Sequence, residues 1–401
     1  MKVVINGAGI AGTALAYWLG KQGHDVHLIE QAPAPRTGGY VLNLWGVGYD
    51  AAEKMGLLPR LQQLQYHSEH LRMVDRHGRT SGGYPPQVLL QLTRGRIATL
   101  ARSDIAAAIH GLLDGRVHTH YGDSIASIEP DGPHVHVGFD RGPPLQADLV
   151  VGADGLHSRI RQLAFGQDAR YEYPMGCHVA AFEVAGYRPR EDGVYVAHSA
   201  PGRYIARFPV RGDKMLFFLL FRDEYLAGVV PTNDAERKAA LKQVYADVGW
   251  ECPAILSGLA DTGSVYFDRV SQIRMDAWNR GRVALVGDAA ACPSLIAGSG
   301  AGFAMAQAYV LAGELHEHPN DLERALSRYE ARLKPFVARK QQAAEKMVPS
   351  FVPATGLGVR ARDLATVLMR LPVCPRLLMG RYLNDEIALP AYAMEPPNPT
   401  H

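Results

Sequence analysis

Residues 2–30 read KVVINGAGIAGTALAYWLGKQGHDVHLIE, and this stretch decides the fold. A short β-branched run ends at Asn6, and a helical pattern follows from about Ile10. Residues 25–30 then alternate between polar and apolar side chains like a second strand. The order strand–helix–strand predicts the opening unit of a Rossmann-like α/β domain.

Glycines occupy the turn between the first strand and the helix, in the order GAGIAG. The first glycine allows the tight turn, the second lets the backbone approach a pyrophosphate, and the third lets helix and strand pack closely. An acid ends the second strand, where a carboxylate accepts hydrogen bonds from ribose hydroxyls. A bare glycine-rich turn is the alternative, but strand, helix and acid together predict dinucleotide binding. The predicted binding residues are Gly7, Gly9, Ile10, Ala11, Gly12, Glu30 and its neighbour Gln31.

The composition narrows the class of protein. The 401 residues carry a formal net charge of +2, with 47% hydrophobic and 20% charged residues, so nucleic-acid binding has no electrostatic support. The four cysteines lack zinc or disulfide spacing, so we expect no metal site and a reduced, cytoplasmic protein. The sequence enters a strand pattern at once, without a signal peptide, and the longest apolar run, 215–221, is too short to span a bilayer.

The pattern changes along the chain and predicts an interrupted domain. Aromatic and β-branched runs at hairpin spacing fill residues 172–269 and indicate an antiparallel sheet, whereas buried-strand and helical patterns lie on either side. We therefore expect a discontinuous cofactor domain, a substrate sheet inserted into it, and C-terminal helices. The expected boundaries are 1–70, 96–171 and 270–345 for the cofactor domain, 71–95 and 172–269 for the sheet domain, and 346–401 for the helical segment and tail.

Two further motifs follow predicted strands. The segment GADG at 152–155 comes after an apolar strand, and VGDAAACP at 286–293 comes before a glycine-rich loop at 298–302. Each motif alone is typical of an ordinary turn. The three glycine motifs are informative together, because their order and spacing along the chain are more specific than any one of them.

With these three motifs, residues 1–345 resemble the class A FAD-dependent monooxygenases, typified by para-hydroxybenzoate hydroxylase, and more narrowly the tetracycline-inactivating monooxygenases. The resemblance implies a glutathione-reductase-type FAD domain, with FAD as cofactor, NADPH or NADH as electron donor and O2 as co-substrate. Oxygen transfer from a C4a-hydroperoxyflavin to a hydrophobic aromatic or polycyclic small molecule is the implied reaction. A reductase or dehydrogenase on the same scaffold, or a non-catalytic flavin- or ligand-binding protein, are the alternatives. The oligomeric state stays open between monomer and dimer.

The resemblance also implies roles by position. The first motif would hold the ADP half of FAD, Arg102 would reach FAD from a following helix, and Asp288 would hold the ribityl chain. A helix beginning near Ala301 would direct its N-terminal dipole at the flavin ring. The implied contacts beyond the first motif are Arg36, Gly38, Gly39, Tyr40, Arg102, Asp154, Gly155, Gly287, Asp288, Pro293, Gly298, Ser299, Gly300, Ala301 and Gly302. The chain departs from many relatives at Cys292, which we interpret as a small filler residue.

The substrate side is less defined. The weak catalytic candidates on the inserted strands are Tyr204, Arg207, His178 and His198. Strand alternation places Tyr204 and Arg207 on opposite faces, so only part of this set can line one pocket. Near the C-terminus, the apolar and basic stretch 364–378 has two interpretations: it caps the core, which we expect, or it lies on a membrane surface.

Overall fold

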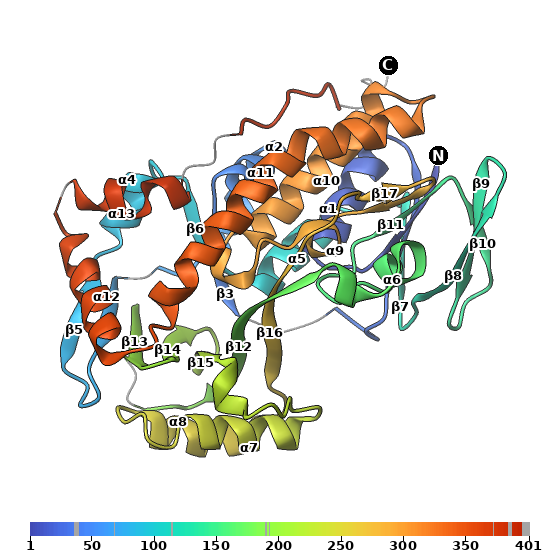
Figure 1. Ribbon diagram of the computed structural model, residues 1–401. Coiled ribbons are helices and arrows are strands. Elements are labelled where there is room, and N and C mark those ends of the chain that lie inside the picture. The colour runs from blue at the N-terminus through green and yellow to red at the C-terminus, as the bar shows by residue number, and fades with distance from the viewer. Residues whose placement is uncertain are drawn as a thin grey trace.

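The computed structural model describes residues 1–35, 40–67, 69–113, 115–188, 191, 193–371, 373–383 and 387–394, with only the backbone for 381–383. The predicted contacts Arg36, Gly38 and Gly39 lie outside these residues. Two large sheets lie in different parts of the molecule, and the long helix α11 (Leu322–Phe351) runs from one part to the other (Figure 1).

A six-stranded sheet carries the first glycine motif. Its order is β17-β18-β11-β1-β2-β7, and β1 pairs in parallel with both β2 and β11. Val3, Val4 and Ile5 of the central strand are fully buried, as expected for a parallel strand covered on both faces. The strand bounds are β1 (Lys2–Asn6), β2 (Asp25–Glu30), β7 (Val117–Tyr121), β11 (Leu149–Gly152), β17 (Asn279–Arg280) and β18 (Val283–Leu285).

Helices α1 (Ile10–Lys21) and α10 (Gly300–Glu317) pack against each other beside this sheet. Helix α2 (Val47–Lys54) crosses α10 where Gly48 meets Gly302. A Cβ atom built on Gly48 would overlap the backbone of Gly302, so the two helices touch without intervening side chains. The other helices of this part are α3 (Leu58–Leu64), α5 (Arg102–His110), α6 (Arg159–Phe165) and α9 (Asp288–Ala291).

Two small sheets accompany the six-stranded sheet. A two-stranded sheet pairs β3 (Val41–Trp45) with β6 (Ile97–Ala101), and a three-stranded sheet has the order β10-β9-β8. The bounds of the latter strands are β8 (Ile125–Asp131), β9 (His134–Phe139) and β10 (Leu145–Ala147).

A seven-stranded sheet contains the inserted strands, in the order β16-β12-β15-β14-β13-β4-β5. The prediction of a wholly antiparallel sheet is wrong at one pair, because β4 runs parallel to β13. This strand arrives from a distant segment of the chain, so no hairpin sets its direction. The bounds are β4 (His70–Val74), β5 (Thr80–Tyr84), β12 (Glu172–Ala185), β13 (Val194–Ala200), β14 (Arg203–Val210), β15 (Lys214–Arg222) and β16 (Tyr266–Ile273).

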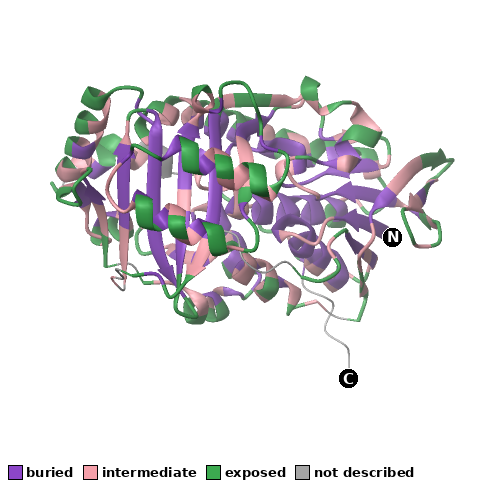
Figure 2. Cartoon of the chain, turned by 90° about the horizontal axis from the view of Figure 1, so that it is seen from below, coloured by how far each residue is buried: buried purple, intermediate pink, exposed green. Residues whose placement is uncertain are grey.

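Helices α7 (Asp234–Val244) and α8 (Cys252–Gly258) cover one face of this sheet, and Figure 2 shows them lying across its buried strands. Helices α12 (Gly356–Leu368) and α13 (Cys374–Leu383) follow α11, beside β5 and α4 (Gln87–Leu92) (Figure 1). The expectation that the stretch 364–378 caps the core is wrong for its leucines: Leu364 is 59% exposed and Leu377 is 78% exposed. Within the described residues, we find no helix that is both long and apolar enough to cross a bilayer.

We predict that Gly48→Ala destabilises the fold by about 1–3 kcal/mol, because the added methyl group forces α2 away from α10. Urea unfolding monitored by circular dichroism measures this change. Gly263→Ala is the matched control, since a Cβ at Gly263 meets nothing within 4 Å. Equal stability of the two variants would contradict the close helix contact.

Candidate cofactor and active site

The first glycine turn joins the end of β1 to the start of α1. Gly7 has φ +106°, and a Cβ there would lie 2.6 Å from the carbonyl oxygen of Ala153, while a Cβ on Gly12 would overlap the Gly7 carbonyl. Both positions therefore require glycine because of their own neighbours. Gly9 differs, since a Cβ there would meet nothing within 4 Å. The backbone at Gly9 faces open space, which fits a pyrophosphate approaching from that side.

Two helix N-termini meet at the same edge of the sheet. Gly9 caps α1 and Ser299 caps α10, and neither residue makes a side-chain capping hydrogen bond within the described chain. The first turns of both helices contain no acidic residue. Because the free amides and the helix dipole of such ends attract anions, this edge fits the phosphates of a dinucleotide.

Glu30 stabilises the glycine turn through hydrogen bonds. Its carboxylate is buried and accepts hydrogen bonds from the amides of Ala8 and Ala32, both at 2.9 Å. The backbone amide of Gly7 also donates to the Ile29 carbonyl at 2.7 Å. The acid that the fingerprint predicts for a ribose therefore also holds the glycine turn in place.

Asp154 ties three segments together. Its carboxylate accepts hydrogen bonds from Asn6 Nδ2 at 3.1 Å, Ser158 Oγ at 2.5 Å and the Ile160 amide at 3.1 Å. Burial raises the pKa of this carboxyl group, and the three hydrogen bonds oppose that rise. These bonds join the end of β1 to the start of α6. Next to it, Gly155 has φ +83° and open space at its Cβ position.

The loop after β18 supplies the other wall. Gly287 has φ +67°, and its amide donates to Gln307 Oε1 of α10 at 2.8 Å. Ser294, directly after Pro293, has φ +97°, a left-handed conformation that is strained for a residue with a side chain. Gly298, at φ +60°, ends the short turn before Ser299. Burial raises the pKa of the Cys292 thiol, so this side chain stays protonated. A protonated, buried thiol agrees with the interpretation of Cys292 as a small filler residue.

Arg102, Tyr40 and Asp288 form one electrostatic group. The Arg102 amide donates to the Tyr40 carbonyl at 3.2 Å. The neighbouring Tyr40 and Asp288 groups raise the pKa of Arg102, and burial opposes this rise. Burial raises the pKa of Asp288, and Arg102 opposes that rise. The Arg102 side chain is exposed to solvent. An exposed guanidinium can neutralise a phosphate or an anionic ring.

A chain of aromatic rings leads from Tyr40 to the seven-stranded sheet. The Phe218 ring lies 6.5 Å from the Tyr40 ring and 6.5 Å from the Tyr204 ring, measured between centroids. Tyr204 and Tyr195 share a hydrogen bond of 3.0 Å between their hydroxyl groups, and Tyr266 lies 6.0 Å from Tyr40. Burial raises the pKa of both Tyr195 and Tyr204, so they remain protonated hydrogen-bond donors near neutral pH.

The remaining sequence candidates face the other side of the sheet. His178 contacts Asp223 at 2.8 Å and stacks on Phe221, and His198 contacts the carbonyl oxygens of Val74 and Val248. These partners belong to the face that α7 and α8 cover. The structure therefore does not bring the two histidines together with Tyr204.

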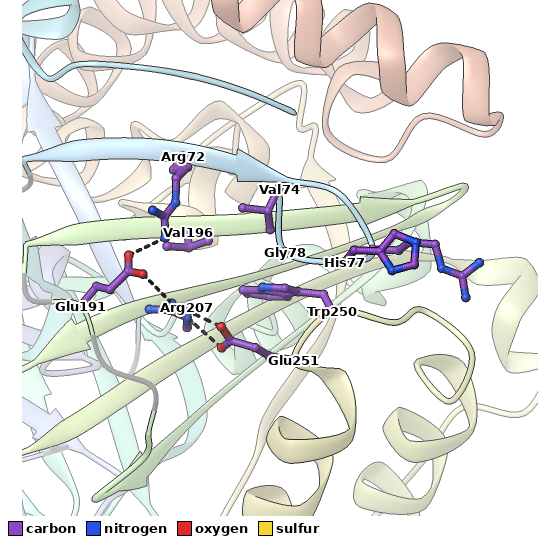
Figure 3. Close-up of a pocket in the computed structure, with 10 residues that line it drawn as sticks. Arg72, Val74, His77, Gly78, Glu191, Val196, Arg207, Trp250 and Glu251 are labelled. Atoms are coloured by element: carbon purple, nitrogen blue, oxygen red, sulfur yellow. Dashed lines mark hydrogen bonds and ion pairs between the residues drawn. The ribbon is translucent and has the colours of Figure 1, made fainter. Parts of the chain in front are cut away.

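Arg207 lies on this helix-covered face as well. Its guanidinium contacts Glu251 at 2.9 Å and lies near Trp250, on one wall of a pocket of about 320 Å³ (Figure 3). Arg72 and Glu191 form an ion pair on the same wall. This pocket is separated from Tyr40 and Asp288 by the thickness of the sheet.

Sequence reasoning missed Phe218, Tyr266 and Ser294. The pairing register of β14 and β15 would have identified Phe218. Phe218 pairs with Ala206, and Ala206 lies two residues from Tyr204, so Phe218 and Tyr204 share a face of the sheet. Nothing in the sequence marks Ser294, because its strain arises from the turn around it. Gly302 is placed against Gly48, so it has a helix-packing role that the sequence did not suggest.

The chain was compared with known proteins. The family described as "FAD binding domain" matches residues 1–344. An uncharacterized protein of Mycobacterium tuberculosis is 35% identical over 363 residues, covering 88% of this chain and 94% of that protein. A flavin-dependent monooxygenase of Legionella longbeachae is 30% identical over 360 residues, covering 88% and 90%. The crystal structure of tetracycline destructase Tet(51) matches with a TM-score of 0.81 and 29% identity, covering 98% of this chain and 99% of that one.

These likenesses extend over nearly the whole chain and include the glycine turn, the Asp154 segment and the Asp288 loop. The match covers both the dinucleotide-binding edge and the inserted sheet. The chain belongs to the FAD-binding-domain family and is an FAD-dependent monooxygenase.

Proposed function

We propose that this protein uses NADPH or NADH and O2 to hydroxylate a hydrophobic aromatic or polycyclic small molecule. The observation that carries this proposal is the aromatic face from Tyr40 through Phe218 to Tyr204, which continues from the dinucleotide edge onto the inserted sheet. Aromatic side chains in a buried setting favour stacking and apolar contact with a ring-bearing ligand. The similar structure is named a tetracycline destructase, which agrees with a polycyclic substrate class.

The residues around the glycine turn are proposed to hold FAD. Gly9 admits the pyrophosphate, Glu30 fixes the loop and contacts the ribose, and Arg102 and Asp288 flank the ribityl and ring portion. The amides at the start of α10 stabilise negative charge on the ring. When bound, FAD carries electrons from the reduced nicotinamide nucleotide to O2, so that one oxygen atom enters the substrate.

Tyr204 is proposed to orient the substrate. Because burial raises its pKa, its hydroxyl donates a hydrogen bond instead of acting as a base. Tyr195 fixes the direction of that hydroxyl through the 3.0 Å bond between them. A hydroxyl or carbonyl oxygen of the substrate, held by Tyr204 and bounded by Phe218, then presents its ring toward Tyr40. Apolar neighbours keep water from this site.

The purified, FAD-loaded protein tests the reaction class. We expect substrate-dependent oxidation of NADPH or NADH that requires O2, with a product one oxygen atom heavier in mass spectrometry. Turnover without O2 and without oxygen incorporation would overturn the monooxygenase proposal in favour of a reductase or dehydrogenase. A bound flavin that neither nucleotide reduces, with every candidate substrate present, would instead indicate a binding protein.

We predict that Glu30→Gln weakens FAD binding about tenfold, because the side-chain nitrogen that replaces one carboxylate oxygen cannot accept a hydrogen bond from a backbone amide. Fluorescence titration of FAD with the apoprotein measures the affinity. Asp25→Asn, at the exposed start of the same strand, is the control and should leave the affinity unchanged. Unaltered binding in the Glu30 variant would refute its proposed role.

We predict that Tyr204→Phe lowers kcat/KM about tenfold while FAD affinity stays at the wild-type value, because one substrate hydrogen bond is lost. Steady-state oxidation of the nicotinamide nucleotide with substrate measures the first quantity. Tyr187→Phe removes a buried hydroxyl that contacts Glu251 on the opposite face, and it should leave kcat/KM unchanged. Equal effects of the two substitutions would argue for a purely structural role of Tyr204.

A further inference from the structure

Helix α12 directs its polar side chains inward. Asp363 accepts a hydrogen bond from Ser81 Oγ at 2.5 Å, and Thr366 Oγ1 accepts one from the Gly83 amide at 2.8 Å. Arg362 donates to Ser199 Oγ at 2.8 Å. These bonds anchor the helix on β5 and β13. A surface helix normally buries its apolar side, so α12 has the opposite orientation.

The outward side of α12 and the segment after it are apolar. Leu357, Leu364 and Leu368 recur at helical spacing and are 76%, 59% and 41% exposed. Exposed apolar side chains continue along the chain into α13, where Leu377 is 78% and Leu378 is 52% exposed. We call this surface the apolar stripe, made of Leu357, Leu364, Leu368, Leu371, Val373, Leu377 and Leu378. Exposed apolar surfaces of this kind mark sites of contact with a partner or a membrane.

The charges beside the apolar stripe are positive. Arg360 stands between Leu357 and Leu364, and Arg376 precedes Leu377; both side chains are exposed. Neither arginine makes an ion pair with another described residue. The acidic residue described in 354–383 is Asp363, which is buried and bonded to Ser81. A surface with leucines and unpaired arginines is complementary to an apolar layer edged by anions.

The described part of the C-terminal tail lies elsewhere. Tyr309 of α10 donates a hydrogen bond to the Pro390 carbonyl at 2.7 Å, and Gln22 at the end of α1 contacts Met394 at 3.0 Å. Residues 387–394 therefore pack on the far side of the cofactor part (Figure 1). They leave the apolar stripe uncovered.

We propose that α12 and α13 dock in the plane of an anionic lipid bilayer, with the apolar stripe in the boundary between headgroups and acyl chains. Arg360 and Arg376 then contact lipid phosphates. The positive charge favours this occupant over a second copy of the chain, because a two-fold contact would set this positively charged surface against an identical one. The proposal does not depend on the reaction that the protein catalyses. Docking here would place α12, and behind it the β5 edge of the sheet that carries Tyr204, next to the bilayer.

Vesicle sedimentation with the full-length, FAD-loaded protein tests the proposal. We expect binding to phosphatidylcholine vesicles that contain phosphatidylglycerol, weaker binding to phosphatidylcholine alone, and loss of binding in high salt. Leu364→Gln combined with Leu377→Gln should lower the vesicle-bound to free ratio at least tenfold. Val229→Gln with Val230→Gln is the matched control, because these residues are 73% and 47% exposed on a different loop and should leave binding unchanged.

Each other outcome counts against the proposal. Absence of binding to the anionic vesicles overturns it, as does equal binding of the stripe and control variants. A dimer in light scattering that the Leu364 and Leu377 substitutions convert to a monomer, without vesicle binding, would assign the stripe to a second copy. If that double variant fails to fold, Arg360→Gln with Arg376→Gln replaces it; undiminished binding of this pair to anionic vesicles would also overturn the proposal.

Discussion

The contact between the ends of β1 and β11 leaves no room for a side chain at Gly7, and the arrangement of the cofactor edge depends on it. The Ala153 carbonyl occupies the space beside Gly7, and Asp154, the next residue, bonds back to Asn6. This close approach sets the direction in which the chain enters α1. The same edge receives Gly287, whose missing side chain lets that loop lie against Ala11. Three segments far apart in the sequence thereby meet at this edge.

Tyr40 lies between this edge and the seven-stranded sheet. Its carbonyl accepts the Arg102 amide, and its ring approaches both Phe218 and Tyr266. Tyr40 thus contacts both the backbone of Arg102, which is proposed to face the cofactor, and the aromatic face that is proposed to hold substrate. The helix-covered face of the same sheet, with His178, His198 and Arg207, stabilises the fold.

Local motifs could be read from the sequence because their physical causes are local. The glycine turn, its flanking strand and helix, and Glu30 lie within 30 residues, and each appears as the pattern predicts. Strand alternation correctly placed Tyr204 and Arg207 on opposite faces of the sheet. It could not predict which of them faces Tyr40, because that depends on where α7 and α8 pack. Likewise, the pattern of α12 is the same whether its leucines face in or out. Only the hydrogen bonds of Asp363 and Thr366 decide its orientation.

The contact between Gly48 and Gly302 has a consequence for how sequences of this fold can change over time. Neither position can gain a side chain unless the two helices separate, and separation displaces the start of α10 next to the cofactor loop. A substitution at one glycine cannot be compensated at the other, because the partner has no atoms left to remove. Helix packing alone is therefore enough to keep both positions glycine.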